Sequence, residues 1–223
     1  MEKSRFVKLL LAGLLLTAIA CQGEQVHPIT KRRIASVMGM AGADWLVRPE
    51  RESEERPEEA LKAIGIEKGS TVADVGAGVG YFTWRLAEAV GPQGVVYGED
   101  VQRAMLDELT RNMKKRGITN VRPVLGGYED PKLPANSVDL ILLVDVYHEF
   151  SEPEKMLDHM RDSLKPNGRL VLLEYRAEDP DVPIRPEHKM TVKQVRAEVE
   201  PQGYRFEKSI ETLPQQHIIV FRK

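Results

Sequence analysis

Residues 72–80 read VADVGAGVG, an apolar stretch that carries one acid, Asp74, followed by glycines at positions 76, 78 and 80. The apolar run predicts a buried strand, and the glycines predict a sharp turn whose backbone a ligand can approach closely. In an open α/β sheet, ligands bind beyond the carboxyl ends of the strands. We therefore expect a small-molecule site at this turn, contacted by Asp74, Gly76, Ala77, Gly78 and Gly80.

The spacing of these glycines separates two classes of cofactor. It is G-x-G-x-G, whereas the dinucleotide fingerprint is G-x-G-x-x-G. Asp74 would repel a pyrophosphate, but S-adenosylmethionine has no phosphate and carries cationic ammonium and sulfonium groups. We therefore favour S-adenosylmethionine. An NAD-dependent oxidoreductase and a turn that only packs a helix on a strand are the alternatives.

Strand-like and helix-like segments alternate around this turn. Strands are predicted at 71–75, 94–98, 120–125, 138–144 and 169–174, and helices at 81–90, 102–116 and 151–164. Such alternation predicts βαβ units and a doubly wound, mostly parallel α/β sheet. Two further strand-like runs, 204–210 and 217–221, have no helix between them and predict a closing antiparallel hairpin.

Four segments resemble successive motifs of the class I S-adenosylmethionine-dependent methyltransferases. They are VADVGAGVGYF (72–82), VYGEDVQRAML (96–106), NSVDLILLVDVYHEF (136–150) and LKPNGRLVL (164–172). The resemblance spans roughly residues 60–175 and is strongest to the small-molecule enzymes of ubiquinone and menaquinone biosynthesis. It implies a seven-stranded, Rossmann-like methyltransferase fold, S-adenosylmethionine as the cofactor and a small-molecule methyl acceptor.

The resemblance also implies roles for residues at the second predicted strand. An acid that closes this strand in the family accepts hydrogen bonds from the ribose hydroxyls of the cofactor. The matching residue here is Asp100, with Glu99 as its neighbour and backup and Val101 beside them.

The turn after the third predicted strand departs from the family pattern. The family often carries an acid there that contacts the adenine amino group, and Gly127 stands in its place. We expect Tyr128 or Glu129 to make the adenine contact instead, although Tyr128 can equally well only cover the loop.

The loop after the fourth predicted strand holds the candidate catalytic residues. In the family this loop faces the transferred methyl group. Here it carries Asp145, which is expected to contact the cofactor, and the two candidate catalytic residues, His148 and Glu149. His148 is the candidate general base for an acceptor hydroxyl, and Glu149 is expected to orient it. A histidine at this position can also serve only for packing, and an acceptor that is already an amine or thiolate needs no base.

Two flanking segments are expected to shape the acceptor pocket. Residues 45–51 are predicted to cover the cofactor as a lid, and the proline-rich insertion 180–186 follows the fifth predicted strand. Their arginines are candidates for bidentate binding of a substrate carboxylate, with a solvated surface role as the alternative for Arg48, Arg51 and Arg185.

The composition limits the partners. The chain has 223 residues, a formal net charge of −2 and one cysteine. The small net charge argues against a nucleic-acid partner, and a single cysteine excludes an intrachain disulfide and a cysteine-based zinc site. We assign no metal ligands, and the sequence leaves the oligomeric state open.

The first 21 residues have the organisation of an export signal. Three basic residues within positions 3–8 precede an apolar run, 9–20, which ends at Cys21. The run is too short to span a bilayer comfortably. Its small final residues fit either ordinary A-x-A cleavage or a bacterial lipoprotein signal in which Cys21 is acylated and associates with the membrane.

These patterns divide the chain into three parts. We predict a signal segment (1–21), a tether and N-terminal helical lid (22–60) that includes a helix at 31–42, and a methyltransferase domain (61–223). The expected location is periplasmic or membrane-anchored, or cytoplasmic if the first segment is not processed. Because S-adenosylmethionine is made in the cytoplasm, an exported protein that binds or senses it without catalysis is the main alternative function.

Overall fold

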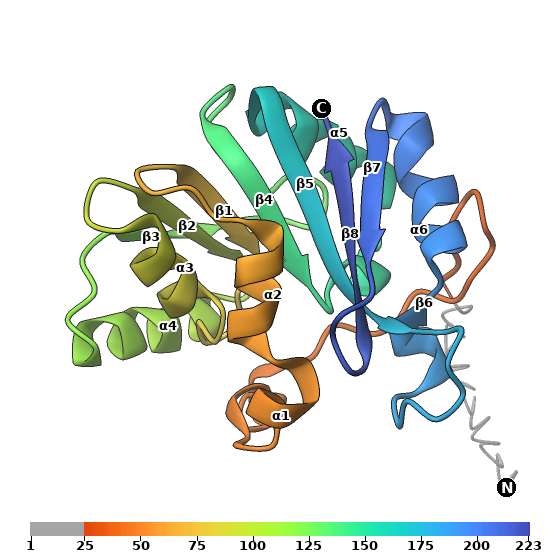
Figure 1. The fold of residues 1–223 in the computed structure, drawn as a ribbon, viewed down its shortest axis with the longest axis horizontal. Coiled ribbons are helices and arrows are strands. Elements are labelled where there is room, and N and C mark those ends of the chain that lie inside the picture. The colour runs from red at the N-terminus through yellow and green to blue at the C-terminus, as the bar shows by residue number, and fades with distance from the viewer. Residues whose placement is uncertain (1–24) are drawn as a thin grey trace, which may run out of the picture.

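One mixed β-sheet forms the centre of the computed structural model, which describes residues 25–223 (Figure 1). Its strands are β1 (Thr71–Val75), β2 (Val95–Asp100), β3 (Val121–Leu125), β4 (Val138–Val144), β5 (Leu164–Arg176), β6 (Lys189–Met190), β7 (Arg205–Ile210) and β8 (Gln216–Arg222). The helices are α1 (Arg51–Glu55), α2 (Pro57–Ile64), α3 (Thr83–Val90), α4 (Arg103–Lys115), α5 (Pro153–Ser163) and α6 (Val192–Val199). Short 3₁₀ helices lie at Met40–Gly42, Trp45–Val47, Tyr147–Glu149, Pro186–His188 and Glu200–Gln202.

The strands lie in the order β3-β2-β1-β4-β5-β8-β7, and the two-residue β6 pairs with β5 beside this path. The sheet is parallel from β3 to β5, and β8 runs antiparallel to both β5 and β7. The expected doubly wound sheet with a closing hairpin is thus confirmed, with β6 as a short strand beyond the seven expected. The strand order reverses between β1 and β4, so the carboxyl ends of these strands form a topological switch point.

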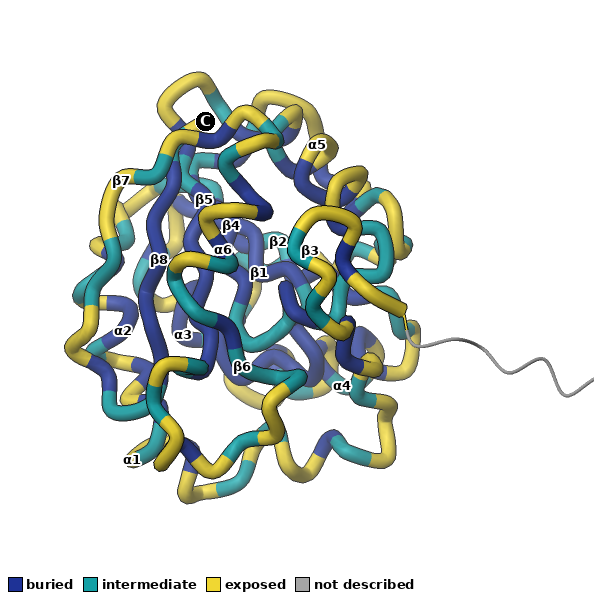
Figure 2. The backbone as a smooth tube through the Cα atoms, turned by 90° about the vertical axis from the view of Figure 1, so that its right-hand side faces the viewer, coloured by how far each residue is buried: buried dark blue, intermediate teal, exposed yellow. Residues whose placement is uncertain are grey.

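Alternate residues of the central strands enter two cores, one on each face of the sheet. Val72 packs with residues of α2 and α3, whereas its neighbour Ala73 packs with residues of α5 and α6. This period of two follows from the pleat of a strand. Strands covered on both faces are buried nearly throughout, as β8 is in Figure 2.

The expected helix at 31–42 is wrong, because the backbone of this segment bonds elsewhere. Val26 forms an isolated bridge with Arg33, Ile34 N–H donates to the Gln25 carbonyl, and Ala35 N–H donates to the His148 carbonyl. Only the 3₁₀ turn at Met40–Gly42 is helical. Long-range hydrogen bonds therefore take the place of the helical hydrogen bonds expected from the apolar spacing of this segment.

The N-terminal part of the described chain is fixed against α6. The side chain of Glu198 is fully buried and accepts hydrogen bonds from Thr30 and from the Arg32 guanidinium. His27, also fully buried, lies 3.2 Å from the same carboxylate. Residues 25–35 therefore pack on the C-terminal half of the domain, although the sequence predicted a tether at the start of the segment 22–60.

Two local details near α5 and β6 also differ from expectation. The helix predicted at 151–164 begins at Pro153, and no side chain caps it. Proline fits the first helical position because it lacks the N–H that would be unpaired there. The elements β6 and α6 were not predicted.

Within residues 25–223, no helix is long and apolar enough to cross a bilayer. The predicted signal segment at 1–21 and the first residues of the tether, 22–24, lie outside the described residues.

Candidate cofactor and acceptor site

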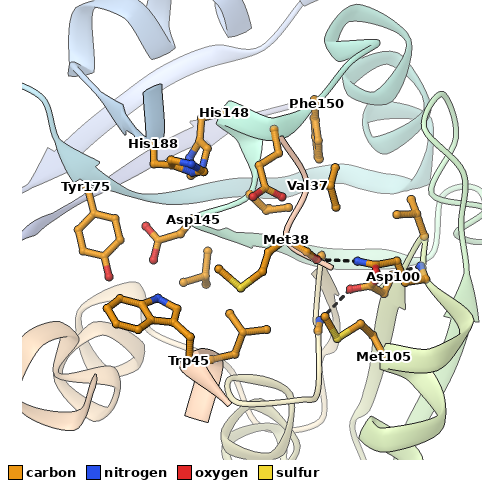
Figure 3. A pocket seen from close by; sticks show the side chains of 18 of the residues that line it. Val37, Met38, Trp45, Asp100, Met105, Asp145, His148, Phe150, Tyr175 and His188 are labelled. Carbon is orange, nitrogen blue, oxygen red and sulfur yellow. Dashed lines mark hydrogen bonds between the residues drawn. The ribbon is translucent and has the colours of Figure 1, made fainter. Parts of the chain in front are cut away.

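A cavity of about 570 Å³ lies beyond the carboxyl ends of β1, β2, β4 and β5. Its wall combines the glycine turn after β1, the end of β2, the loop after β4, residues 37–51 and the segment 183–188. In Figure 3, Asp100 and Met105 lie on one side of this space, and His188 and Tyr175 lie on the other. The cavity therefore lies at the switch point, beyond the carboxyl ends of the strands, where the small-molecule site was predicted.

The glycine turn presents its backbone to the cavity through Gly76 and Gly78. Both have left-handed backbone conformations, with φ of 74° and 54°, which residues with a Cβ rarely adopt. A Cβ on Gly76 would lie only 2.4 Å from the side chain of Val146, and one on Gly78 would lie 3.0 Å from Leu46. The turn therefore requires glycine for both its conformation and its close packing.

Asp100 joins the end of β2 to this turn. Its Oδ2 accepts a hydrogen bond from Gly78 N–H at 2.9 Å, and its Oδ1 accepts one from Gln102 N–H at 2.8 Å. The side chain is almost fully buried yet lines the cavity. Burial raises the pKa of Asp100, while its two backbone donors lower it. A carboxylate has further lone pairs beyond these two contacts, which leaves acceptors for ribose hydroxyls.

Glu99 stands beside Asp100 and is more deeply buried. Its Oε2 accepts a weak hydrogen bond from Gly76 N–H at 3.3 Å, and its Oε1 has no partner among the described residues. Burial, followed by repulsion from Asp100, raises the pKa of Glu99 to about 8. Two adjacent buried carboxyls cannot both ionise cheaply, so Glu99 is mostly protonated at neutral pH.

Three residues predicted to contact the cofactor lie behind the cavity wall. Asp74 accepts a hydrogen bond from the Thr83 hydroxyl at 2.6 Å, and burial raises its pKa to about 6. A Cβ on Gly80 would meet Met113 and Leu109 of α4, so this glycine serves close helix packing. The third, Ala77, belongs to the same apolar cluster as these α4 residues.

The loop after β3 contributes to the cavity through Gly127 and Tyr128. The ring of Tyr128 is largely exposed, and Gly127 N–H bonds back to the Asp130 carbonyl. Glu129 does not line the cavity, because its carboxylate pairs with Lys155 at the surface at 2.8 Å. Of the two residues predicted to contact the adenine, only Tyr128 lines the cavity, and its contact with the adenine stays a prediction.

The loop after β4 brings Asp145 to the cavity in a strained conformation. Its φ is 51°, and its Oδ2 accepts a hydrogen bond from Gln216 at 2.7 Å. Its other oxygen is buried without a partner among the described residues. Burial raises the pKa of Asp145, and the nearby charges of Glu55 and Glu174 add to this rise.

His148 is oriented by Glu174, and the expected orientation by Glu149 is wrong. The Nδ1 of His148 lies 2.6 Å from Glu174 Oε2, and its Nε2 lies 3.1 Å from His188 Nδ1. Burial lowers the pKa of His148, but the charge and hydrogen bond of Glu174 outweigh this and raise it overall. Glu149 also lines the cavity, and burial raises its pKa to about 7.

The three candidate arginines differ in availability. Arg51 is buried and already donates to Glu55 at 2.6 Å and to the Leu46 carbonyl at 2.7 Å, so it holds the fold of α1. Arg48 stacks on the Trp45 ring at 3.7 Å and pairs with Glu54. The third, Arg185, lines the cavity from the insertion after β5. Part of the segment 45–51 lines the cavity, and its role as a lid over the cofactor stays a prediction.

Sequence reasoning missed Glu174, Tyr175 and His188, which the fold brings to the acceptor side of the cavity. A charged residue at the end of the buried strand β5 was the available signal for Glu174, whose side chain is fully buried. Tyr175 donates to Glu55 at 3.0 Å and so links β5 to α1. No local pattern marks His188.

Comparisons with known proteins agree with this geometry. Residues 66–213 match a family model described as a methyltransferase domain. The solved structure of a SAM-dependent methyltransferase from Aquifex aeolicus is 30% identical in sequence, with a TM-score of 0.79, and the match covers 83% of this chain and 99% of that one.

Curated relatives match over a shorter stretch. A demethylmenaquinone methyltransferase of Geobacillus sp. (strain WCH70) is 32% identical over 117 residues, which are 52% of this chain and 50% of that protein. The ubiquinone/menaquinone biosynthesis C-methyltransferase UbiE of Pasteurella multocida is 31% identical over 116 residues, 52% and 43% of the two chains. The aligned stretch is thus half or less of the length of these relatives. The matches to the domain model and to the Aquifex structure are wide enough to conclude that this chain belongs to the methyltransferase domain family, with S-adenosylmethionine as its cofactor.

Proposed function

We propose that the protein transfers the methyl group of S-adenosylmethionine to a small-molecule acceptor. The layout of the cavity is the observation that supports this most strongly. The glycine turn and Asp100 lie at one end, and His148 and Tyr175 lie at the other (Figure 3). The volume of about 570 Å³ falls within the range of about 300–1,000 Å³ typical of small-molecule sites.

In this proposal the protein acts mainly by positioning. The glycine turn binds the methionine part of the cofactor, Asp100 accepts from its ribose, and the loop at Asp145 faces the sulfonium methyl group. The acceptor atom forms a bond to the methyl carbon as the carbon–sulfur bond breaks, and S-adenosylhomocysteine leaves as the second product. Holding the two reactants in line can lower the barrier by about 7–11 kcal/mol.

The acceptor is proposed to have an apolar body and one polar nucleophilic atom. Apolar side chains such as Val37, Phe150 and Ile184 line the cavity, and the histidine pair supplies its polar groups. Relatives named as demethylmenaquinone methyltransferases make a hydroxylated aromatic ring a reasonable first acceptor to test. For such a ring, His148 is the candidate general base, oriented by Glu174.

Calorimetry and an activity assay test the proposal separately. The purified protein should bind S-adenosylmethionine and S-adenosylhomocysteine but not NAD, and it should release S-adenosylhomocysteine when supplied with demethylmenaquinol or simpler hydroquinones. Binding without turnover across a broad acceptor panel would favour the sensor alternative. Preference for NAD would reject the cofactor assignment.

We further propose that the protein is exported and held at a membrane through Cys21. Basic residues, an apolar run and small residues precede this cysteine in the order of an export signal. Lipidation requires the thiol, so Cys21→Ser should block lipid labelling and processing at this residue, whereas A-x-A cleavage should tolerate the change. An intact Met1 terminus in a soluble fraction, measured by mass spectrometry, would reject both forms of export.

A further inference from the structure

Two histidines and a glutamate meet at the acceptor side of the cavity. His148 and Glu149 come from the 3₁₀ helix Tyr147–Glu149, and His188 ends the 3₁₀ helix Pro186–His188. One ligand-type atom from each side chain lies within 4.8 Å of the other two. Figure 3 shows the imidazole rings of His148 and His188 beside each other at the cavity wall. We propose that His148, His188 and Glu149 bind a divalent transition-metal ion of the zinc type.

The donor set matches the chemistry of such an ion. Catalytic zinc sites commonly use two histidines and one carboxylate and keep a fourth position open. Two nitrogens bound to one tetrahedral ion at about 2.0–2.1 Å lie about 3.3 Å apart. His148 Nε2 and His188 Nδ1 are separated by 3.1 Å. Metal binding requires a small increase in this distance and a movement of the Glu149 carboxylate toward the two nitrogens, from which it lies within 4.8 Å.

A buried carboxylate fixes the imidazole of His148 in the orientation that a metal ligand needs. Glu174 is fully buried, and its Oε2 lies 2.6 Å from His148 Nδ1. In the neutral imidazole this nitrogen therefore carries the proton, and Nε2 offers its lone pair to the ion. Glu174 is itself held by Tyr147 N–H, which donates to its Oε1 at 3.1 Å. A carboxylate that accepts from the second nitrogen of a histidine ligand is a regular partner in metal sites.

The surrounding backbone holds the donors in place. The carbonyl of His148 accepts hydrogen bonds from Ala35 N–H at 3.1 Å and from the Arg32 guanidinium at 3.0 Å. On the other side, the residue after His188 begins β6, which pairs with β5 at Tyr175. The three donors therefore lie on segments that long-range contacts have already ordered, and they all line the cavity.

All three donors line the cavity, so we assign the open position of the ion to the methyl acceptor, a consequence that rests on the proposed function. An acceptor hydroxyl bound to the ion has a lowered pKa and releases its proton to water. Its oxygen then forms the bond to the methyl carbon while the carbon–sulfur bond breaks. Metal binding occupies the lone pair of His148 Nε2, so in the loaded protein the ion replaces His148 as the activating group.

Metal titration of the full-length protein tests the inference. After removal of bound metal with a chelator, Zn²⁺ and Co²⁺ are titrated by calorimetry, and the visible absorption of bound Co²⁺ reports its coordination. We expect one ion per chain with a tetrahedral or five-coordinate Co²⁺ spectrum. Both His188→Ala and Glu149→Gln should weaken binding at least 100-fold, and Glu174→Gln should weaken it about 10- to 100-fold, as changes in supporting carboxylates do.

The matched control is His159→Ala, which removes an exposed histidine of α5 and should leave metal affinity unchanged. Thermal unfolding of each metal-free variant verifies folding, and His188 is the preferred position because it is only partly buried. Equal Zn²⁺ affinity in the parent and in folded His188→Ala would overturn the inference, as would failure of the parent to bind either ion. Calorimetry with S-adenosylmethionine is run in parallel, so loss of the metal site and loss of the cofactor site are told apart.

Discussion

The carboxylate of Asp100 accepts a hydrogen bond from the backbone N–H of Gly78 at 2.9 Å and so ties the end of β2 to the glycine turn after β1. The two residues are 22 positions apart in the chain, and both line the cavity. One side chain therefore both shapes the turn expected to bind the methionine part of the cofactor and offers acceptors to its ribose. This double role makes Asp100 the residue on which cofactor binding should depend most.

Replacing Asp100 by alanine should weaken binding of S-adenosylmethionine by 100-fold or more. The variant loses the carboxylate that accepts two hydrogen bonds from the ribose hydroxyls, each worth about 1.5–3 kcal/mol. It also leaves Gly78 N–H without its acceptor. Glu99→Ala should cost much less. Calorimetry of both variants gives the ranking, and unfolding without cofactor shows whether the turn has collapsed. The reverse ranking would identify Glu99 as the residue that accepts from the ribose.

Local sequence predicted that the glycine turn and Asp100 lie together at the cavity, but four other predicted cofactor contacts do not line it, namely Asp74, Ala77, Gly80 and Glu129. Most of the acceptor end was not predicted. Asp100 and the glycines lie in short segments whose strand and turn patterns are strong, so their positions follow once the strand order is known. His148 meets Glu174 and His188, which are 26 and 40 residues further along the chain. Such pairings depend on how β5 and the insertion after it fold back, and periodicity carries no information about that.

The N-terminal segment shows the same limit for secondary structure. The apolar spacing at 31–42 suits a helix, yet the backbone of Ala35 bonds to His148 and the side chain of Arg32 bonds to Glu198, so most of the segment is not helical. A two-residue strand such as β6 is too short to show alternation at all. Tertiary contacts decided both cases, since they outweigh local preference where a segment is short.

Asp74 should act on the cofactor through its charge and on stability through Thr83. It lies behind the turn, hydrogen-bonded to the Thr83 hydroxyl. Asp74→Asn removes the charge but keeps an acceptor, so affinity for cationic S-adenosylmethionine should fall about tenfold, which corresponds to about 1.4 kcal/mol. Thr83→Val keeps the charge but leaves a buried oxygen without its donor, so it should lower the free energy of unfolding by about 1–3 kcal/mol. Equal effects of both variants on affinity would show that Asp74 has only a structural role.

Gly78 should be required for cofactor binding beyond the strain that any side chain adds there. Its φ is 54°, and a Cβ would point toward Leu46 in the cavity wall. Gly65 provides the matched control, because its φ is 69° and a Cβ would meet nothing within 4 Å. Each alanine variant should lose about 1–2 kcal/mol of stability from backbone strain. Calorimetry should find weakened S-adenosylmethionine binding in Gly78→Ala alone; unchanged affinity in that variant would place the cofactor elsewhere.

Glu99 should make the cofactor-free protein less stable as the pH rises. Its pKa in the folded protein is about 8, raised by burial and then by Asp100 from an ordinary value of 4.5. The folded state therefore holds this proton more tightly than the unfolded chain does. The resulting stabilisation is fully present below pH 4.5 and is lost as the pH rises through about 8, with a slope of at most about 1.4 kcal/mol per pH unit.

Glu99→Gln removes this dependence while keeping the size of the side chain. Other buried acids with raised pKa values, such as Asp74 and Glu149, change stability in the same direction in both proteins. The difference between the two curves of unfolding free energy against pH therefore isolates Glu99. Between about pH 5 and about pH 9, denaturant unfolding should show a weaker pH dependence of the unfolding free energy in the variant. The unfolding free energy of the variant, relative to that of the parent, should rise toward alkaline pH. Parallel curves would mean that Glu99 ionises normally, and its free oxygen would then be an acceptor for the ribose equal to Asp100.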